Sequence, residues 1–282
     1  METKRMTLLK GIAIGGIAML TAACSDSDDD HSASVVHKDK APHSMKSDSH
    51  AAAAAGHAAH WAYDGNGAPH AWGVLKEEYG TCTTGKHQSP IDISPVTISD
   101  LSAIQFNYKS SPLELTNNGH TVQANYHTGS YITVSGKRYD LLQFHFHSPS
   151  EHTIGGKSYD MVAHLVHKAA DGQLGVIGVL FKAGNKNKVI DKLWANLPTA
   201  SGETKAVKNT RINALDLLPV DLTYFNYSGS LTTPPCSEGV NWIVMATPSS
   251  ISKKQVKQFT DLFPLSVRPA QPLNGRVVRV SN

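Results

Sequence analysis

From about residue 61 onward, the pattern of hydrophobic and polar positions predicts one domain built mainly of strands. Runs rich in aromatic and β-branched residues are typical of strands, and they are Tyr131–Val134, Leu141–His147, Met161–Val166 and Val176–Phe181. Glycine-containing dipeptides that favour turns separate these runs, namely Asn118-Gly119, Ser135-Gly136, Gly155-Gly156 and Asp171-Gly172. Only two stretches have the spacing of short amphipathic helices, and they are Lys186–Leu197 and Ser252–Leu262.

One predicted strand carries two histidines on the same face. Side chains alternate along a strand, so His145 and His147 project together, about 7 Å apart. An antiparallel return of the next strand would bring His164 beside them, whereas His167 would face the other way as a hydrogen-bonded core histidine. Three imidazoles with an open fourth position are the arrangement of a catalytic zinc site. A His-x-His motif in a surface strand also arises by coincidence, and the motif alone leaves that alternative open.

The first residues have the pattern of an export signal. Basic residues precede an apolar run, Gly11–Ala23, that is too short to span a bilayer and ends directly before Cys24. We therefore predict a signal peptide of the lipoprotein type over residues 1–23, with Cys24 lipidated. Cleavage nearby without lipidation is the alternative. The prediction places the protein in the periplasm or cell envelope, with membrane contact only through its N-terminal lipid.

Residues 24–60 contain almost no large apolar side chains to form a core. Their runs of Asp and Ala, with scattered Ser, Lys and His, cannot offset the entropy lost on ordering, so we expect a disordered tether. Six of the chain's 15 histidines lie in this segment. Weak metal binding is therefore an alternative to a simple polar spacer.

Charge and cysteine content narrow the classes of function. The net charge is +3, and the absence of a basic stripe argues against nucleic-acid binding. With Cys24 assigned to the lipid, Cys82 and Cys236 remain of the three cysteines. In an oxidising compartment such a pair forms a disulfide by default, and two buried free thiols are the alternative.

Several motifs, in the same order along the chain, resemble those of the alpha-class carbonic anhydrases. The zinc-site signature of that family is matched by Gln143–His147, Ser150–Thr153 and His164–His167. Further matches are Gln88–Ile93, Asn117–His120, Gly229–Cys236, Trp242–Val244 and Arg268–Leu273. The resemblance extends from about Trp61 to the C-terminus, so residues 61–282 are interpreted as the catalytic domain.

The resemblance implies a fold, a cofactor and a reaction. The implied fold is mainly β (α+β), with a large twisted, mostly antiparallel central sheet and short peripheral helices. His145, His147 and His164 would bind Zn²⁺ at the bottom of a cone-shaped cleft, with water or hydroxide as the fourth ligand. The implied enzyme is a carbonate dehydratase, a lyase that reversibly hydrates carbon dioxide to bicarbonate and a proton. Secreted members also have a disulfide where Cys82 and Cys236 lie.

The resemblance also assigns catalytic roles. Thr232 would accept a hydrogen bond from the zinc hydroxide and donate one to ionised Glu151, which can only accept. Thr233 would contact bicarbonate. His120 would be the proton shuttle, because an unperturbed histidine pKa near ~6.5 suits proton transfer to buffer. Polar residues around the zinc would be Gln143, Tyr63, Asn118 and Gln123, and the apolar pocket for carbon dioxide would comprise Val166, Val176, Leu231, Val240 and Trp242.

Val162 departs from the family pattern. Two residues before the third zinc histidine the family usually has a glutamate, which accepts that ligand's other ring N–H. Loss of such a partner typically costs about 10–100-fold in metal affinity or activity. Either a water or a carbonyl takes this role, or zinc is held more weakly.

Two alternatives to an enzyme are a catalytically idle relative of the fold and a periplasmic zinc-binding lipoprotein. Idle relatives usually lack a zinc histidine, and this sequence lacks none. The histidine-rich tether is what suggests the zinc-binding lipoprotein. We favour the enzyme, with carbon dioxide and bicarbonate as its small-molecule ligands and a monomer or homodimer as its state.

Overall fold

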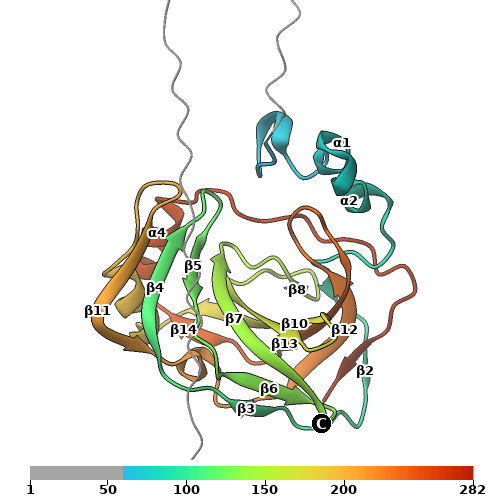
Figure 1. The fold of residues 1–282 in the computed structure, drawn as a ribbon. Helices are drawn as coiled ribbons and strands as arrows, with labels where there is room; N and C mark the ends of the chain where they lie inside the picture. The colour runs from blue at the N-terminus through green and yellow to red at the C-terminus, as the bar shows by residue number, and fades with distance from the viewer. Residues whose placement is uncertain (1–59, 282) are drawn as a thin grey trace, which may run out of the picture. The chain divides into compact units, whose positions relative to one another are not determined.

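The computed structural model describes residues 60–281, and one large sheet dominates this part of the chain (Figure 1). The predicted signal peptide, the Cys24 lipidation site and the tether before His60 lie outside the described residues. The strands are β1 (Asp92–Ile93), β2 (Val96–Ile98), β3 (Gln105–Asn107), β4 (Ser111–Asn117), β5 (Val122–Asn125), β6 (Tyr131–Val134), β7 (Lys137–His147), β8 (Thr153–Ile154), β9 (Met161–Ala169), β10 (Leu174–Ala183), β11 (Thr204–Ile212), β12 (Tyr224–Ser230), β13 (Glu238–Met245), β14 (Ser249–Ile251) and β15 (Val278–Val280). The helices are α1 (Trp72–Leu75), α2 (Thr81–Thr84), α3 (Lys188–Trp194) and α4 (Lys253–Thr260), with 3₁₀ turns at Gly65–Gly67, Glu77–Tyr79 and Ala214–Leu217.

The main sheet has 13 strands, in the order β11-β4-β5-β7-β9-β10-β13-β12-β15-β2 along its path, with β14 on β10 and the β3–β6 pair attached at β7. Most neighbours are antiparallel, whereas β10–β13, β10–β14 and β15–β2 are parallel. Figure 1 shows the strands twisting progressively across this sheet. The predicted mainly β fold with a twisted, mostly antiparallel sheet is confirmed. None of the described helices has the length and apolar character needed to cross a membrane.

The predicted strands exist, and three of them are longer than expected. β6 has the predicted bounds, while β7, β9 and β10 each continue past them. β9 is buried at nearly every position because hydrophobic clusters pack on both faces of the sheet. β7 shows the predicted alternation, with Phe144 and Phe146 fully buried in one cluster. That burial fixes which face His145 and His147 occupy, since a one-residue slip in register would reverse it.

The two main helices are shorter than the predicted ranges, and polar side chains at their N-termini set where they begin. Asn187 accepts hydrogen bonds from the N–H groups of Val189 and Ile190, at 3.0 and 3.1 Å, so α3 begins at Lys188. α4 follows Ser252, which forms a capping box with Gln255. Both predicted helices are therefore confirmed, with their starts set by capping, and they end before the predicted limits, at Trp194 and Thr260.

A disulfide joins Cys82 of α2 to Cys236, which confirms the predicted pair. Arg268 lies next to this bridge, and its guanidinium donates to the Cys82 carbonyl and to Gln88. The structure has cis peptide bonds at Ser89-Pro90, Ser94-Pro95, Ser148-Pro149 and Pro234-Pro235. The N-terminal helices and the loop before β13 are thus tied to the segment that carries Arg268.

Candidate metal centre

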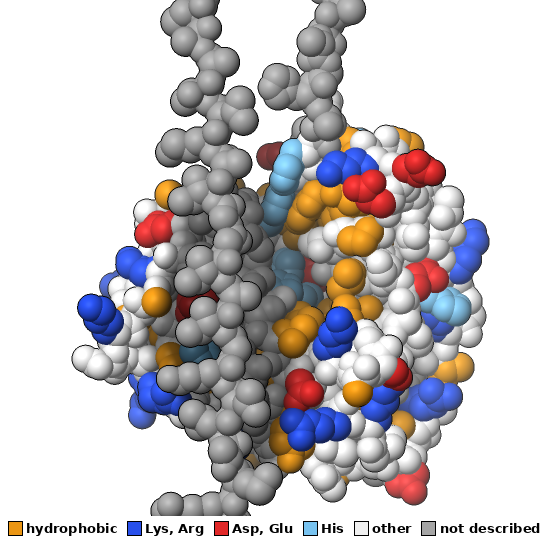
Figure 2. Space-filling model, in the orientation of Figure 1, with side chains coloured by type: hydrophobic (Ala, Val, Ile, Leu, Met, Phe, Trp, Pro, Cys, Tyr) orange, Lys and Arg blue, Asp and Glu red, His pale blue; other side chains and the backbone are white. Residues whose placement is uncertain are grey.

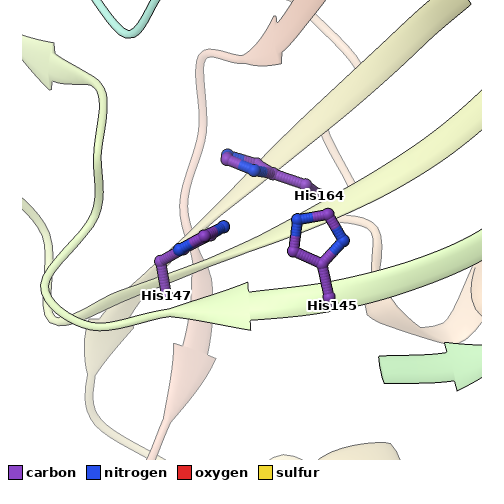
Figure 3. A group of neighbouring side chains, drawn as sticks. All are labelled: His145, His147 and His164. Atoms are coloured by element: carbon purple, nitrogen blue, oxygen red, sulfur yellow. The ribbon is translucent and has the colours of Figure 1, made fainter. Parts of the chain in front are cut away.

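Strand pairing brings three histidines together. His145 and His147 leave the same face of β7, and the antiparallel register places His164 of β9 directly opposite His145. One ring nitrogen from each histidine lies within 4.8 Å of the others, so the three could hold a metal ion. Figure 3 shows the three rings converging from the two strands. This is the arrangement predicted from the strand pattern.

Hydrogen bonds fix the orientation of the two β7 imidazoles. Nδ1 of His145 lies 2.9 Å from the side-chain amide oxygen of Gln143, and Nδ1 of His147 lies 2.6 Å from the backbone carbonyl oxygen of Ser266. A carbonyl oxygen only accepts, so both Nδ1 atoms carry the proton and each Nε2 keeps a free lone pair. Nε2 of His147 is buried and has no partner among the described residues. These lone pairs suit a metal such as zinc.

His164 presents its other nitrogen to the site. Its Nδ1 lies 3.8 Å from Oε2 of Glu151, and Nε2 of His147 lies 3.7 Å from the same oxygen. The two nitrogens therefore face the same space. Nε2 of His164 points elsewhere, is buried and has no partner among the described residues. Val162, fully buried beside it, supplies no acceptor, and no carbonyl in this part of the chain replaces the missing carboxylate.

Burial keeps these imidazoles in the form that a metal needs. Desolvation, reinforced by the neighbouring His147, lowers the pKa of His145 and of His164 well below the usual histidine value. Both rings are therefore neutral near pH 7, and a neutral imidazole binds metal without first losing a proton.

His167 behaves as the predicted core histidine. It lies 2.7 Å from the Tyr108 hydroxyl through Nε2 and 3.2 Å from the Gly175 carbonyl through Nδ1. Burial lowers its pKa to about 4. With both nitrogens occupied on the opposite face of β9, His167 takes no part in the metal group.

The Glu151 carboxylate lies close to two of the three histidines, His147 and His164. Its Oε1 accepts a 2.9 Å hydrogen bond from the Arg268 backbone N–H, and its Oε2 has no partner among the described residues. Burial raises the pKa of Glu151, while His147, the Arg268 amide and the Thr232 hydroxyl act against that rise. Thr232 is itself buried and is the hydroxyl placed to interact with this carboxylate.

A cavity of about 140 Å³ connects the histidines with the predicted polar residues. It is lined by Trp61, Tyr63, Asn118, His120, Thr121, Gln123, Gln143, His145, His147 and Thr233. Figure 2 shows histidine side chains within a depression of this face, beside hydrophobic ones. The Asn118 side chain accepts the His120 backbone N–H at 3.0 Å, which fixes the turn, and Gln123 donates to Asn125 at 2.7 Å. The predicted shuttle histidine and the predicted polar residues therefore share one space with two of the histidines.

His120 has neighbours that the sequence motifs did not indicate. Its ring stacks on Trp61 with centroids 3.6 Å apart, and the His60 ring lies 5.2 Å away in a parallel orientation. Burial, with a smaller contribution from His60, lowers the pKa of His120 to about 4.

Two further site groups could not be found from side-chain motifs, because they belong to the backbone. They are the Ser266 carbonyl, which contacts His147, and the Arg268 amide, which contacts Glu151.

The predicted apolar residues also come together. Val166, Val176, Val240 and Trp242 are buried in one cluster, and Leu231 packs at its edge. The Trp242 ring lies 4.9 Å from that of His164. An apolar wall therefore stands directly beside the histidine group.

Comparison with known proteins identifies the family. Residues 67–282 match the family described as eukaryotic-type carbonic anhydrase. The chain belongs to the alpha-class carbonic anhydrases. A carbonic anhydrase of Klebsiella pneumoniae is 48% identical over 225 residues, which cover 78% of this chain and 91% of that protein.

Solved structures agree with this assignment. A hyperthermostable carbonic anhydrase from a hydrothermal vent chimney superposes with a TM-score of 0.77 and 52% identity, covering 79% of this chain and all of that one. The alpha-carbonic anhydrase of Thermovibrio ammonificans, solved with sulfanilamide, gives 0.76 and 44%, covering 78% and 99%. The protein is accordingly an enzyme that reversibly hydrates carbon dioxide, and the reading as a catalytically idle relative is not favoured.

Proposed function

We propose that His145, His147 and His164 hold a catalytic zinc ion during carbon dioxide hydration. The observation that carries the proposal is the set of three imidazoles that each place one nitrogen within 4.8 Å of the others. The chemistry that zinc would supply there is a bound water with its pKa lowered to about 7, and hence a nucleophile at neutral pH. The Gln143 and Ser266 carbonyls hold two of the rings in the tautomer that this requires.

Glu151 and Thr232 would orient the attacking oxygen. The Arg268 amide occupies Oε1 of Glu151, which leaves Oε2 as the acceptor for the Thr232 hydroxyl proton. Once Thr232 donates to Glu151, its oxygen can only accept from the nucleophile. Thr233, on the cavity wall, would contact the bicarbonate product.

The apolar wall would hold carbon dioxide before attack. Val166, Val176, Leu231, Val240 and Trp242 offer no hydrogen bond to water from their aliphatic and ring carbons, and the Trp242 ring nitrogen already donates to the Ser230 carbonyl at 2.9 Å. An apolar substrate competes well with water on such a surface. His120 would then carry the product proton from the cavity to buffer, since its ring lines the same cavity as His145 and His147.

Stopped-flow carbon dioxide hydration tests the zinc assignment. Prolonged dialysis against a chelator should abolish hydration, and one equivalent of zinc should restore it. His147→Ala should remove zinc from the purified protein, whereas His127→Ala, at an exposed histidine outside the cavity, should retain both zinc and activity. Full activity in protein shown to be free of metal would contradict the proposal.

We also propose that the enzyme is exported and anchored in the cell envelope by lipid on Cys24. The apolar run ending at Cys24 supports this proposal. Cys24→Ser should shift the protein from the membrane fraction to the soluble fraction on cell fractionation. Deletion of the residues before Trp61 should leave the hydration rate intact, and a loss of activity would instead favour a zinc-binding role for the histidine-rich segment.

A further inference from the structure

Two histidine nitrogens near Val162 are buried and have no hydrogen-bond partner among the described residues. They are Nε2 of His164 and Nδ1 of His152. The two residues are 1% and 0% exposed, respectively. Polar nitrogens buried this deeply are nearly always hydrogen-bonded in folded proteins, so each of them needs a partner.

Both rings border the same part of the sheet. Val162 and His164 are two residues apart on β9, so their side chains lie on the same face of the strand. Val162 belongs to the hydrophobic cluster that contains Trp242 and Tyr227. The Trp242 ring lies 4.9 Å from the His164 ring and 4.6 Å from the His152 ring. In members of this family a glutamate usually occupies the position of Val162. The shorter, apolar valine therefore lies near two imidazoles that each have one nitrogen without a partner among the described residues.

The distance between the rings decides how they can interact. The His152 and His164 centroids are 6.1 Å apart. A ring nitrogen lies about 1.2 Å from its centroid, so the two nitrogens are at least about 3.7 Å apart, which is too far for a direct hydrogen bond. Two bonds of about 2.8–3.0 Å to one water reach across up to about 6 Å. Two polar partners are the lower limit for a buried water.

We propose that one buried water bridges Nε2 of His164 to Nδ1 of His152, which makes His152 the positioning residue for the third zinc ligand. With Nδ1 of His164 directed at the metal, its Nε2–H donates to the water, and the water donates to Nδ1 of His152. Nε2–H of His152 then donates to the Tyr227 hydroxyl at 2.6 Å, and Tyr227 donates to Ser89 at 2.8 Å. This inference rests on the zinc binding proposed above.

Zinc transfer to a chelator from the loaded enzyme tests the bridge. His152→Phe removes the acceptor, and zinc should be lost about tenfold faster, at the lower end of the usual effect because the contact is indirect. His167→Phe is the matched control, because it also removes a buried histidine that is hydrogen-bonded to a tyrosine. His167 lies on the face of β9 opposite to His164. The zinc-loss rate of this variant should equal that of the wild type.

Zinc content of the wild type is measured first. A wild type without zinc would contradict the metal assignment itself, whereas a loaded wild type and an unchanged rate in His152→Phe would overturn only the bridge. His152→Gln, whose carbonyl oxygen can accept from the water, should keep a rate near that of the wild type. This variant also decides the matter if the phenylalanine variant does not fold, because a tenfold faster loss from the glutamine variant would argue against the bridge.

Val162→Glu provides the second test. The carboxylate should accept the His164 N–H directly and displace the water, so zinc should leave more slowly than from the wild type. In that background, His152→Phe should change the rate little, because His152 no longer acts through Nε2 of His164. Equal tenfold effects of His152→Phe in both backgrounds would overturn the bridge, as would a crystal structure with only apolar contacts between the two rings.

Discussion

At the scale of single residues, the surroundings of His120 set how strong a base its ring is. The ring stacks on Trp61 and lies near His60, and its pKa is lowered to about 4. A proton acceptor is most effective when its pKa lies near the working pH. In the stacked position His120 is therefore a weaker base at pH 7 than an exposed histidine.

His120→Ala should lower kcat for carbon dioxide hydration by about 10-fold or more while leaving kcat/KM nearly unchanged, because it removes proton transfer and not the attack on substrate. Stopped-flow measurements at pH 7 should also show partial rescue by added imidazole. The exposed His127→Ala is the control and should behave as the wild type. An unchanged kcat would mean that the stacked ring is idle, and equal falls in both parameters would place His120 in the chemical step.

At the scale of elements, the β7–β9 pairing could be predicted from the sequence because it depends on local alternation. Phe144 and Phe146 are buried on one face, so His145 and His147 must share the other, and one antiparallel return is enough to add His164. The parallel pairing of β10 with β13 joins residues 66 apart in sequence, such as Val176 and Trp242, and no local pattern specifies such a neighbour. The short edge strands, such as β2, also lack an alternating pattern to indicate them.

β9 also carries a pH-sensitive group on its other face. His167 has a pKa of about 4 in the folded protein against 6.5 when exposed, so the unfolded chain binds more protons between these values. The contribution of His167 to the free energy of unfolding should therefore be constant above pH 6.5 and should fall as the pH drops from 6.5 to 4. Buried His152, with a pKa of about 3, acts in the same direction.

His167→Gln should make the metal-free protein less stable at pH 7, because the hydrogen bonds of the imidazole to Tyr108 and Gly175 are lost. The stability of the variant should also fall less as the pH drops, because the titrating group is gone. Urea unfolding between pH 4 and 7 should give a slope that is smaller by up to one proton than that of the wild type. His127→Gln, at the exposed position, should keep the wild-type slope. An identical slope in His167→Gln would show that His167 is not held neutral in the folded state.

At the scale of the whole molecule, backbone groups from the C-terminal segment complete the candidate site. The Ser266 carbonyl orients His147 across 119 residues of sequence, and the Arg268 amide binds Glu151 across 117. The identities of the histidines were predictable, whereas these partners were not, because any residue type has a carbonyl and nearly any has an amide. Arg268 also binds the Cys82 carbonyl, so the same segment connects the site to the disulfide.

The disulfide should stabilise the whole domain through the unfolded chain. Cys82 and Cys236 are 154 residues apart in sequence, and the chain-entropy relation for such a loop gives about 5 kcal/mol. The double variant Cys82→Ser/Cys236→Ser should lose about that much in urea unfolding, with a lower midpoint, and denatured wild-type protein should show neither of these thiols as free. Reducing agent should lower the wild-type midpoint toward that of the double variant and leave the double variant unchanged.

Because Arg268 connects Cys82 to Glu151, the double variant should also hydrate carbon dioxide more slowly at temperatures where it remains folded. Full stability in the double variant would show that packing around Trp72 and Arg268 holds this region without the bridge.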